Sequence, residues 1–404
     1  MPETRRLLPA LHTRSEPVSR ERLTERGFDR AMERMLSMQP EDIIAEVKAS
    51  GIKGRGGAAF PTGIKWAGVH AAAGGTRYVV MNADESELGT FKDRVLLEQD
   101  PLGALVGVLI AAHAVRARKA YCYIRGEYRE VEQRLAAALT ILAECGWVGP
   151  DAVDVEIRRG AGAYIAGEET ALLNSIEGKR AEPRVKPPFP TNHGLWGAPT
   201  LIQNVETMAN VAVLFAHDVQ WFKECGTPET PGTKLIGLSG YVRHPGVYEV
   251  PFGYPMTNII HDEDLGGGLS GSERLRAILL GGAAGTFMAP EEVEASLLDY
   301  GSLSRYGASI GSGALMVFDD TVDLTWVLKK LARFFADESC GQCVPCRIGT
   351  RRILELLDQE GLKTRAEDLR ELALAMRDAS ICGLGQTAPV ALLSILDRPE
   401  RQGA

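Results

Sequence analysis

Four cysteines near the C-terminal end constrain this chain more than any other feature. Cys340, Cys343 and Cys346 follow one another at two-residue spacing, and Cys382 stands in the segment Ser-Ile-Cys-Gly-Leu-Gly. Thiolates two residues apart on a tight turn can converge on one small metal cluster, and a distant fourth closes the site, as in [4Fe–4S] centres with four cysteine ligands. The pattern predicts an iron–sulfur cluster and one-electron chemistry.

Two other uses of these cysteines fit less well. A structural zinc site usually combines two C-x₂-C or cysteine–histidine pairs, and no histidine stands beside these four. A disulfide framework is disfavoured because 7 cysteines among 404 residues is a low density and the N-terminus lacks an apolar export signal. Cys122, Cys145 and Cys225 are expected to be ordinary buried thiols.

Length and composition indicate a globular protein of two or three domains. The formal charge of −8 disfavours a nucleic-acid partner. The longest apolar stretch, 101–115, is shorter than a membrane span and predicts a buried helix. We therefore expect a cytoplasmic protein that reaches a membrane only through other subunits, as a peripheral component on the cytoplasmic face of the inner membrane.

The pattern of predicted strands and helices changes twice along the chain. Strand-like segments at 77–82, 120–125 and 154–158 alternate with helical ones, including a helix of about 20 residues from Glu127, which predicts a parallel sheet covered by helices. Short strands at 234–240, 246–250, 277–282 and 314–318 predict a small α+β module. Helical spacing follows, and the expected domains are 1–233, 234–319 and 320–404.

Two of the predicted C-terminal helices lead into the cysteines. Apolar residues repeat at helical spacing from Leu324 to Phe335 and again from Leu369 to Met376. The first helix runs into Cys340 and the second into Cys382. We expect two antiparallel helices that deliver all four sulfurs to one end of a bundle.

The second dense feature is a glycine-rich segment at 51–66. It contains G-x-G-x-x-A, but a helix is predicted before it, so the strand–turn–helix context of a dinucleotide-binding fingerprint is missing. Glycines let backbone N–H groups approach an anion, and Arg55 and Lys65 add positive charge. The segment favours a nucleotide or flavin phosphate over a structural surface turn.

Three further segments carry polar or aromatic side chains. Residues 82–87 follow a strand, so their side chains either bind ribityl or ribose hydroxyls or form a solvated loop. Glu168 and Glu169 precede a helix that is expected to begin near Ala171, and they either line a pocket or complement the helix macrodipole. Phe189, in the stiff loop 186–190, either stacks on a planar ring or staples two loops together.

Together these motifs resemble one family. They are Gly54–Gly63, Asn82–Glu87, Gly160–Thr170, Lys186–Pro190, Asn204–Thr207 and Glu338–Cys346. In this order they resemble the NADH-binding flavoprotein subunit of respiratory complex I, called the F subunit or the 51-kDa subunit, and its relatives in NAD-linked hydrogenases and formate dehydrogenases. The resemblance covers nearly the whole chain and implies an α/β Rossmann-like flavin domain, a ubiquitin-like SLBB insert and a helical bundle with one [4Fe–4S] cluster.

The resemblance also implies a set of cofactor-binding residues. FMN is expected to contact Gly54, Arg55, Gly56, Gly57, Ala58, Lys65, Asn82, Asp84, Glu85, Gly167 and Asn204. NADH is expected to stack on the flavin, in a site lined by Phe60, Glu87, Tyr164, Glu168, Glu169, Lys186 and Phe189. Ser86 and Thr207, from the same motifs, complete the predicted set. Glu168 and Glu169 are the candidate catalytic residues, expected to tune nucleotide affinity and not to act as an obligatory acid or base.

The implied reaction is hydride transfer from NADH to FMN, followed by single-electron transfer to the cluster and on to iron–sulfur partner subunits. One partner is expected to be a thioredoxin-like [2Fe–2S] subunit, with quinone as the final acceptor in a complex I type assembly. Ala166 and Gln203 replace a common Cys and a common Asn of the family. The flank Cys382-Gly-Leu-Gly-Gln is similar to the soluble hydrogenase and formate dehydrogenase branch.

Three functions therefore stay open from the sequence. The first is an NADH-oxidising subunit of a complex I type assembly, which the lack of a fused thioredoxin-like domain favours. The second is the diaphorase subunit of a soluble NAD-dependent formate dehydrogenase or NiFe hydrogenase. The third, of a different class, is a zinc-stabilised scaffold or a sugar- or cobalamin-binding protein.

Overall fold

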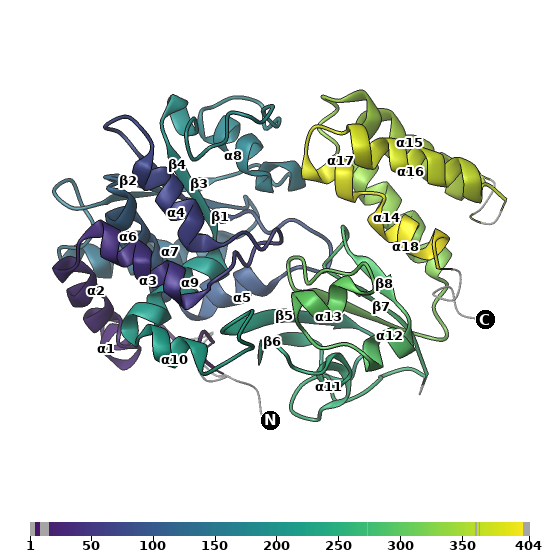
Figure 1. Cartoon of the computed structure of the whole chain (residues 1–404), viewed down its shortest axis with the longest axis horizontal. Helices are drawn as coiled ribbons and strands as arrows, with labels where there is room; N and C mark the ends of the chain where they lie inside the picture. Colours follow the sequence, from purple (N-terminus) through teal and green to yellow (C-terminus); the bar gives the residue numbers. More distant parts are fainter. Residues whose placement is uncertain (1–4, 9–15, 273, 360–361, 363, 399–404) are drawn as a thin grey trace.

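A computed structural model describes residues 5–8, 16–272, 274–359, 362 and 364–398 of the chain. Figure 1 shows a parallel sheet wrapped by helices, a second sheet below and to its right, and a group of helices that ends the chain. The three predicted patterns of the sequence correspond to these three parts. The exact domain boundaries stay a prediction.

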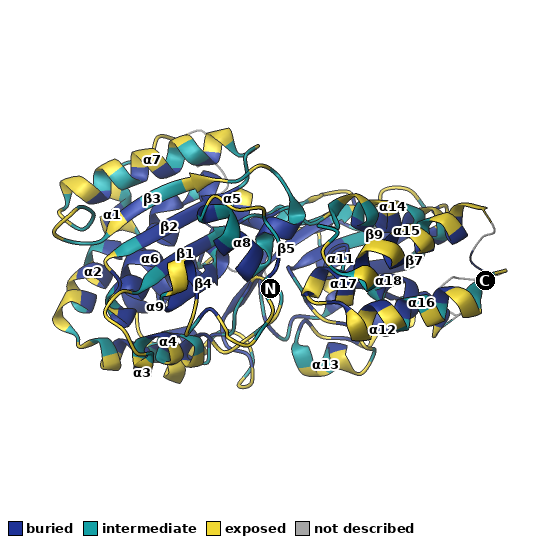
Figure 2. Ribbon diagram, turned by 90° about the horizontal axis from the view of Figure 1, so that it is seen from above, coloured by how far each residue is buried: buried dark blue, intermediate teal, exposed yellow. Residues whose placement is uncertain are grey.

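The first sheet is parallel and has the strand order β3-β2-β1-β4. Its strands are β1 (Tyr78–Ala83), β2 (Lys119–Ile124), β3 (Asp154–Arg159) and β4 (Thr200–Asn204). Successive side chains alternate between its faces, so Val79 and Met81 enter the main core while Val80 enters a smaller core on the other side. Strands β1, β2 and β4 are mostly buried, whereas the edge strand β3 is partly exposed, as Figure 2 shows.

Helices cover both faces of this sheet. The larger group comprises α1 (Glu21–Glu25), α2 (Phe28–Ser37), α3 (Pro40–Ser50), α4 (Thr62–Ala71), α5 (Lys92–Gln99), α6 (Pro101–Val115), α7 (Arg129–Glu144), α9 (Val205–Ala216) and α10 (Val219–Lys223). On the other face lie the short η2 (Tyr164–Gly167), α8 (Glu169–Ile176) and η3 (Leu195–Gly197). Helix α6 is buried except at His113, so the prediction of a buried helix there is confirmed.

The strand order places a crevice beside β1. From β1 the chain passes through α5 and α6 to β2 on one side, whereas β4 on the other side follows β3 in the sequence. Connections that leave in opposite directions open a crevice at the carboxyl ends of the strands, where ligands bind in open α/β sheets. Asn82 and Asn204 are paired in register at this edge.

The second sheet is mixed, with the order β6-β5-β9-β7-β8. Its strands are β5 (Thr233–Gly240), β6 (Gly246–Pro251), β7 (Leu275–Leu280), β8 (Thr286–Met288) and β9 (Ala314–Asp319), and its helices are α11 (Met256–His261), α12 (Pro290–Glu294) and α13 (Tyr300–Ser304). Only β5 and β9 pair in parallel. The three-residue β8 was missed because it is too short to show an alternating pattern.

The chain ends in helices α14 (Leu324–Glu338), α15 (Val344–Gln359), α16 (Ala366–Ala379), α17 (Gly383–Thr387) and α18 (Val390–Leu396). The prediction of one antiparallel pair was wrong. Helices α14 and α16 both end at the cysteines, and α15, which begins there and carries Cys346, packs against both. Sequence periodicity missed α15 because its first turn coincides with the cysteine motif.

Within the described ranges, no single helix is long and apolar enough to cross a membrane. Helices α5 and α6 meet that test only as a pair, with a bend of 98° between them. Helix α6 packs against α9 and the first sheet, as a core helix does.

Candidate functional site

The glycine-rich loop lies between α3 and α4, without a strand before it, as the sequence predicted. Gly57 has a φ of 139°, which favours glycine. A Cβ on Gly56 would stand 3.0 Å from the Cβ of Asn204, the N-cap residue of α9. The missing side chain therefore lets the loop pack closely against the first turn of α9.

This contact forms a cavity of about 190 Å³ at the edge of the sheet. It is lined by Gly54, Gly56, Gly57, Ala58, Ala59, Phe60, Lys65, Asn82, Glu169, Ile202, Gln203, Asn204 and Thr207. The N-terminus of α9 and the ammonium of Lys65 both favour an anion, and small residues leave backbone N–H groups accessible. We call this the phosphate pocket.

Arg55 does not line the phosphate pocket. Its guanidinium is fully buried, donates to the carbonyl of Pro231 at 3.1 Å and lies 4.4 Å from the ring centre of Phe252. The expectation that this side chain adds positive charge to the anion site is therefore wrong. Its contribution is structural, because it fastens the loop to the second sheet while its backbone N–H donates to Thr207.

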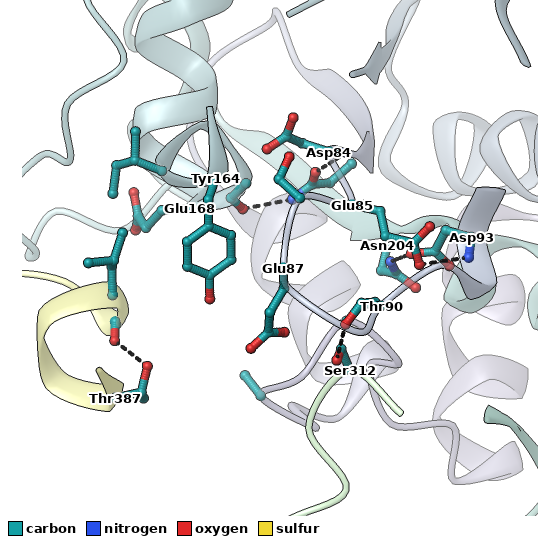
Figure 3. A pocket seen from close by; sticks show the side chains of 18 of the residues that line it. Asp84, Glu85, Glu87, Thr90, Asp93, Tyr164, Glu168, Asn204, Ser312 and Thr387 are labelled. Carbon is teal, nitrogen blue, oxygen red and sulfur yellow. Dashed lines mark hydrogen bonds between the residues drawn. The ribbon is translucent and has the colours of Figure 1, made fainter. Parts of the chain in front are cut away.

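A second cavity of about 380 Å³, shown in Figure 3, shares Gly56, Ala58, Asn82 and Asn204 with the first. It is lined by Gly56, Ala58, Asn82, Asp84, Glu85, Ser86, Glu87, Thr90, Lys92, Asp93, Tyr164, Ile165, Gly167, Glu168, Asn204, Ser312, Gly383, Leu384 and Thr387. We call it the ring pocket. Asn82 fixes its shape, since its amide donates to the carbonyl of Gly167 at 2.8 Å and accepts from the N–H of Asp84.

Carboxylates dominate the ring pocket. Burial raises the pKa of Asp84 to about 7, although Ser86 and Arg125 act in the opposite direction. Burial, with Asp93 next to it, raises the pKa of Glu85 to about 7, and burial does the same for Glu87. Several acids with raised pKa values in one cleft are typical of a functional site.

Glu87 yields a prediction about pH and stability. Its pKa is about 7 in the folded protein and 4.5 as the reference value, so the folded chain holds a proton that the unfolded chain releases between these values. The resulting stabilisation is present below pH 4.5 and is lost as the pH rises through 7, a loss of about 3 kcal/mol. Glu87→Gln, which can still accept from Ala284, should raise the thermal midpoint at pH 8 but not at pH 5.

The exposed Glu144→Gln serves as the control, with no expected effect at either pH. Differential scanning calorimetry of the full-length variants would measure both. A Glu87→Gln protein whose midpoint changes equally at pH 5 and pH 8 would contradict the raised pKa.

Glu168 and Glu169 stand at the start of α8 and carry a chain of ion pairs. The side chain of Glu168 accepts from the N–H groups of Thr170 and Ala171, which caps the helix. Lys186 contacts Glu168 at 3.0 Å and Glu169 at 3.2 Å, and Lys65 contacts Glu169 at 3.1 Å. Both alternatives from the sequence therefore hold, because Glu168 caps a helix and also lines the ring pocket.

The two predicted aromatic contacts differ in position. Phe60 lines the phosphate pocket and is 53% exposed, so its side chain is accessible to a ligand. Phe189 is 54% exposed on the loop that carries Lys186, which is joined to Glu168 and Glu169. Neither ring is packed into the core, and stacking on a nucleotide stays a prediction for both.

The four cysteines are neighbours. Burial raises the pKa of Cys346 to about 11, and Cys343, Cys382 and Cys340 act on it in the same direction. The hydroxyl of Ser339 lies 3.2 Å from the sulfur of Cys346. The hydroxyl of Ser380 is buried without a hydrogen-bond partner, and a Cβ on Gly385 would stand 2.5 Å from it.

This donor set fits an iron–sulfur cluster better than a zinc ion. Across the described segments, no three His, Cys, Asp or Glu side chains are arranged to share one metal ion. A cluster of four irons holds its ligands farther apart than the tight tetrahedron of a mononuclear zinc site. The unpartnered Ser380 hydroxyl would find an acceptor in cluster sulfur.

The cysteines adjoin the ring pocket. Gly383, Leu384 and Thr387, which follow Cys382 on α17, form part of the pocket wall. From the other side, the N–H of Tyr164 donates to Glu338 at the end of α14, and the guanidinium of Arg180 donates to the carbonyl of Cys340. A ligand in the pocket and a cluster on the cysteines would be separated by one thin layer of protein.

Comparisons with known proteins identify this arrangement. Residues 47–213 match the Nuo51 FMN-binding domain, and residues 326–401 match the iron–sulfur binding region of NADH-ubiquinone oxidoreductase F. The chain is 41% identical to an F subunit (F 2) of the NADH-quinone oxidoreductase of Rhizobium meliloti, over 92% of this chain and 90% of the relative. It is 39% identical to the HndC subunit of the NADP-reducing hydrogenase of Solidesulfovibrio fructosivorans, over 92% and 77%.

The solved structures agree with the sequence relatives. The crystal structure of an NAD⁺-reducing [NiFe]-hydrogenase in the H₂-reduced state aligns with a TM-score of 0.84 and 35% identity, over 99% of this chain and 67% of that chain. Fold and site together define a flavoprotein subunit with an iron–sulfur cluster. The chain belongs to the family of the NADH-quinone oxidoreductase F subunits.

Family membership confirms the predicted reaction class and cofactors. The chain is an NADH dehydrogenase component that carries FMN and a [4Fe–4S] cluster and uses NADH. Its relatives are subunits of larger assemblies, so this chain works with partner subunits. The glycine-lined pocket, with Lys65 and the start of α9, and the four cysteines fit these two cofactors.

The ring pocket also contains residues that the sequence analysis missed. They are Thr90, Lys92, Asp93, Ile165, Ser312, Gly383, Leu384 and Thr387. Lys92 and Asp93 lie only five and six residues beyond the polar segment 82–87. Because they form a charged pair at the start of a helix, the sequence could have indicated them as pocket residues. Ser312 comes from the loop before β9 of the second sheet and was not predictable without the tertiary fold.

Proposed function

We propose that this chain oxidises NADH on FMN and passes the electrons singly through the [4Fe–4S] cluster to an iron–sulfur partner. The observation that supports the proposal best is the shared wall between the ring pocket and the segment after Cys382. NADH gives up two electrons and one proton as a hydride, the electrons leave one at a time, and the proton passes to water. FMN when bound supplies the conversion between these two steps.

Each group of residues then has a role. Lys65, the glycine loop and the start of α9 bind the FMN phosphate, with Thr207 and Asn204 beside them. The ring pocket is shaped by Asn82, Asp84, Glu85, Ser86 and Gly167, and Glu87 and Tyr164 also line it. Glu168, Glu169, Lys186, Phe60 and Phe189 form the nucleotide site, where the ion pairs orient the groups that meet NADH. Cys340, Cys343, Cys346 and Cys382 hold the cluster.

We further propose a thioredoxin-like [2Fe–2S] subunit among the partners, and a peripheral position on the cytoplasmic face of the inner membrane. The second sheet would be the ubiquitin-like SLBB unit. The alternative is the diaphorase subunit of a soluble hydrogenase or formate dehydrogenase, which the likeness to the two hydrogenase proteins supports. Genes for membrane subunits next to this one would favour the first assembly, and genes for a NiFe or molybdenum subunit the second.

Anaerobic purification of the full-length chain tests the proposal. We expect about one FMN and about four irons per chain, flavin bleaching within seconds of adding NADH, and an EPR signal from a reduced [4Fe–4S] cluster. Visible spectra, metal analysis and low-temperature EPR measure these quantities. A colourless protein with stoichiometric zinc and no flavin would refute the proposal.

A further inference from the structure

A cluster of buried charges forms part of the wall of the ring pocket, extends behind that wall, and has no role in the function proposed above. It consists of Lys92 and Asp93 from the start of α5, Glu206 from the first turn of α9, and Lys234 from β5. Each side chain is at most 5% exposed. We call this set the Lys92 cluster.

The contacts in the Lys92 cluster are short and connected. The ammonium of Lys92 lies 2.6 Å from Asp93 and 2.9 Å from Glu206, and Lys234 lies 2.5 Å from the same oxygen of Glu206. Asn204 donates to the second oxygen of Asp93 at 2.6 Å. Buried charges are expensive unless paired, so this arrangement holds the Lys92 ammonium in one fixed place.

The environment of Lys92 favours its positively charged form. Burial alone would lower the pKa of Lys92, but Asp93, Glu206 and Glu85 together raise it above its ordinary value. Lys234 differs, because burial lowers its pKa to about 7 in spite of Glu206. Lys92 therefore carries a positive charge in the folded protein, and Lys234 makes a second contact with the Glu206 carboxylate that holds it.

Lys92 also occupies a special position in the ring pocket. Among the pocket-lining residues that the structure describes, it is the only cation, whereas five carboxylates line the same space. These are Asp84, Glu85, Glu87, Asp93 and Glu168. Two electrons added to a ligand here would be placed among carboxylates. The positive charge of Lys92 would compensate the added negative charge.

We propose that Lys92 sets the reduction potential of the bound flavin, with Asp93, Glu206 and Lys234 as the residues that position its charge. This inference rests on the proposed function, because it takes FMN as the ligand of the ring pocket. A buried cation stabilises the reduced state more than the oxidised state, and a buried carboxylate does the opposite. Lys92 should therefore raise the reduction potential of the flavin, and its neighbour Asp93 should lower it.

The test is a spectroelectrochemical titration of the flavin in the full-length holoprotein. Lys92→Gln should lower the two-electron midpoint potential by about 30 to 60 mV, the equivalent of a ten- to hundredfold weaker preference for the reduced state. Lys92→Arg keeps the charge and should stay close to the unmodified protein. Asp93→Asn removes a negative charge and should raise the potential by about 30 mV, or about tenfold.

The opposite signs separate electrostatics from damage to the fold. A shift of the same sign in Lys92→Gln and Asp93→Asn, or an unchanged potential in Lys92→Gln, would overturn the inference. If Lys92→Gln retains no FMN, the other two variants decide. A raised midpoint potential in Asp93→Asn together with an unchanged potential in Lys92→Arg supports the inference. Any other combination refutes it. An unmodified chain that binds no flavin would instead refute the proposed function.

Discussion

Cys382→Ala should abolish the iron–sulfur cluster while leaving the flavin site able to react with NADH. A [4Fe–4S] cluster with only three thiolates loses a ligand that arrives from a separate helix, and this ligand closes the site. We expect iron to fall from about four to below about one per chain, and the EPR signal of the reduced cluster to disappear. Flavin bleaching by NADH should persist, because the residues that shape the ring pocket are unchanged.

Cys145→Ala is the matched control. Cys145 is a half-buried thiol at the end of α7, in a different part of the chain from the four cysteines of the cluster. It should retain the full iron content and EPR signal. Iron analysis, EPR and flavin absorbance on the same preparations measure all three properties, and a Cys382→Ala protein with a complete cluster would show that the fourth ligand was wrongly assigned.

The Cys382→Ala variant also separates stabilisation by the cluster from stabilisation by the apolar cores. Metal binding contributes to folding where ligands come from separate segments, so we expect the C-terminal helices to melt earlier without the cluster. Helix α14 and helix α16 both end at the cysteines and are otherwise held by α15 and an apolar core. The flavin part has its own core, so its melting should change little.

The sequence predicted the features that depend on local pattern. Alternating and helical periodicity placed three of the four parallel strands, the buried helix 101–115 and four of the five strands of the second sheet, because burial of one face imposes a period on the residues. It missed the short strands β4 and β8. The cysteine spacing predicted the cluster, since ligand geometry restricts the spacing in the same way. The family resemblance supplied the cofactors, which the comparisons confirm.

What the sequence could not supply were contacts between distant segments. Arg55 stands in a glycine loop and was assigned to an anion site, yet it is buried against Pro231 and Phe252. Nothing in the local pattern shows on which side of a loop a side chain lies. Lys234 was assigned only to a strand, although its ammonium lies against Glu206 from the first part of the chain.

Lys65→Gln should weaken FMN binding by about ten- to hundredfold, the second large effect that we expect. Lys65 is the only cation among the described residues that line the phosphate pocket. A charge-assisted hydrogen bond to a phosphate contributes about 1.5 to 3 kcal/mol, and its loss also leaves Glu169 without one of its two lysine partners. The remaining carboxylate then repels the phosphate.

Riboflavin provides the decisive comparison, because it has the same ring and lacks the phosphate. Fluorescence titration of the flavin-free chain should give similar riboflavin affinities for Lys65→Gln and the unmodified protein, with the difference confined to FMN. Lys119→Gln, which removes a lysine from a surface ion pair with Asp154 and Glu156, should bind both flavins normally. Equal losses for FMN and riboflavin in Lys65→Gln would mean that Lys65 supports the shape of the pocket, and the phosphate would then have to be assigned to other residues.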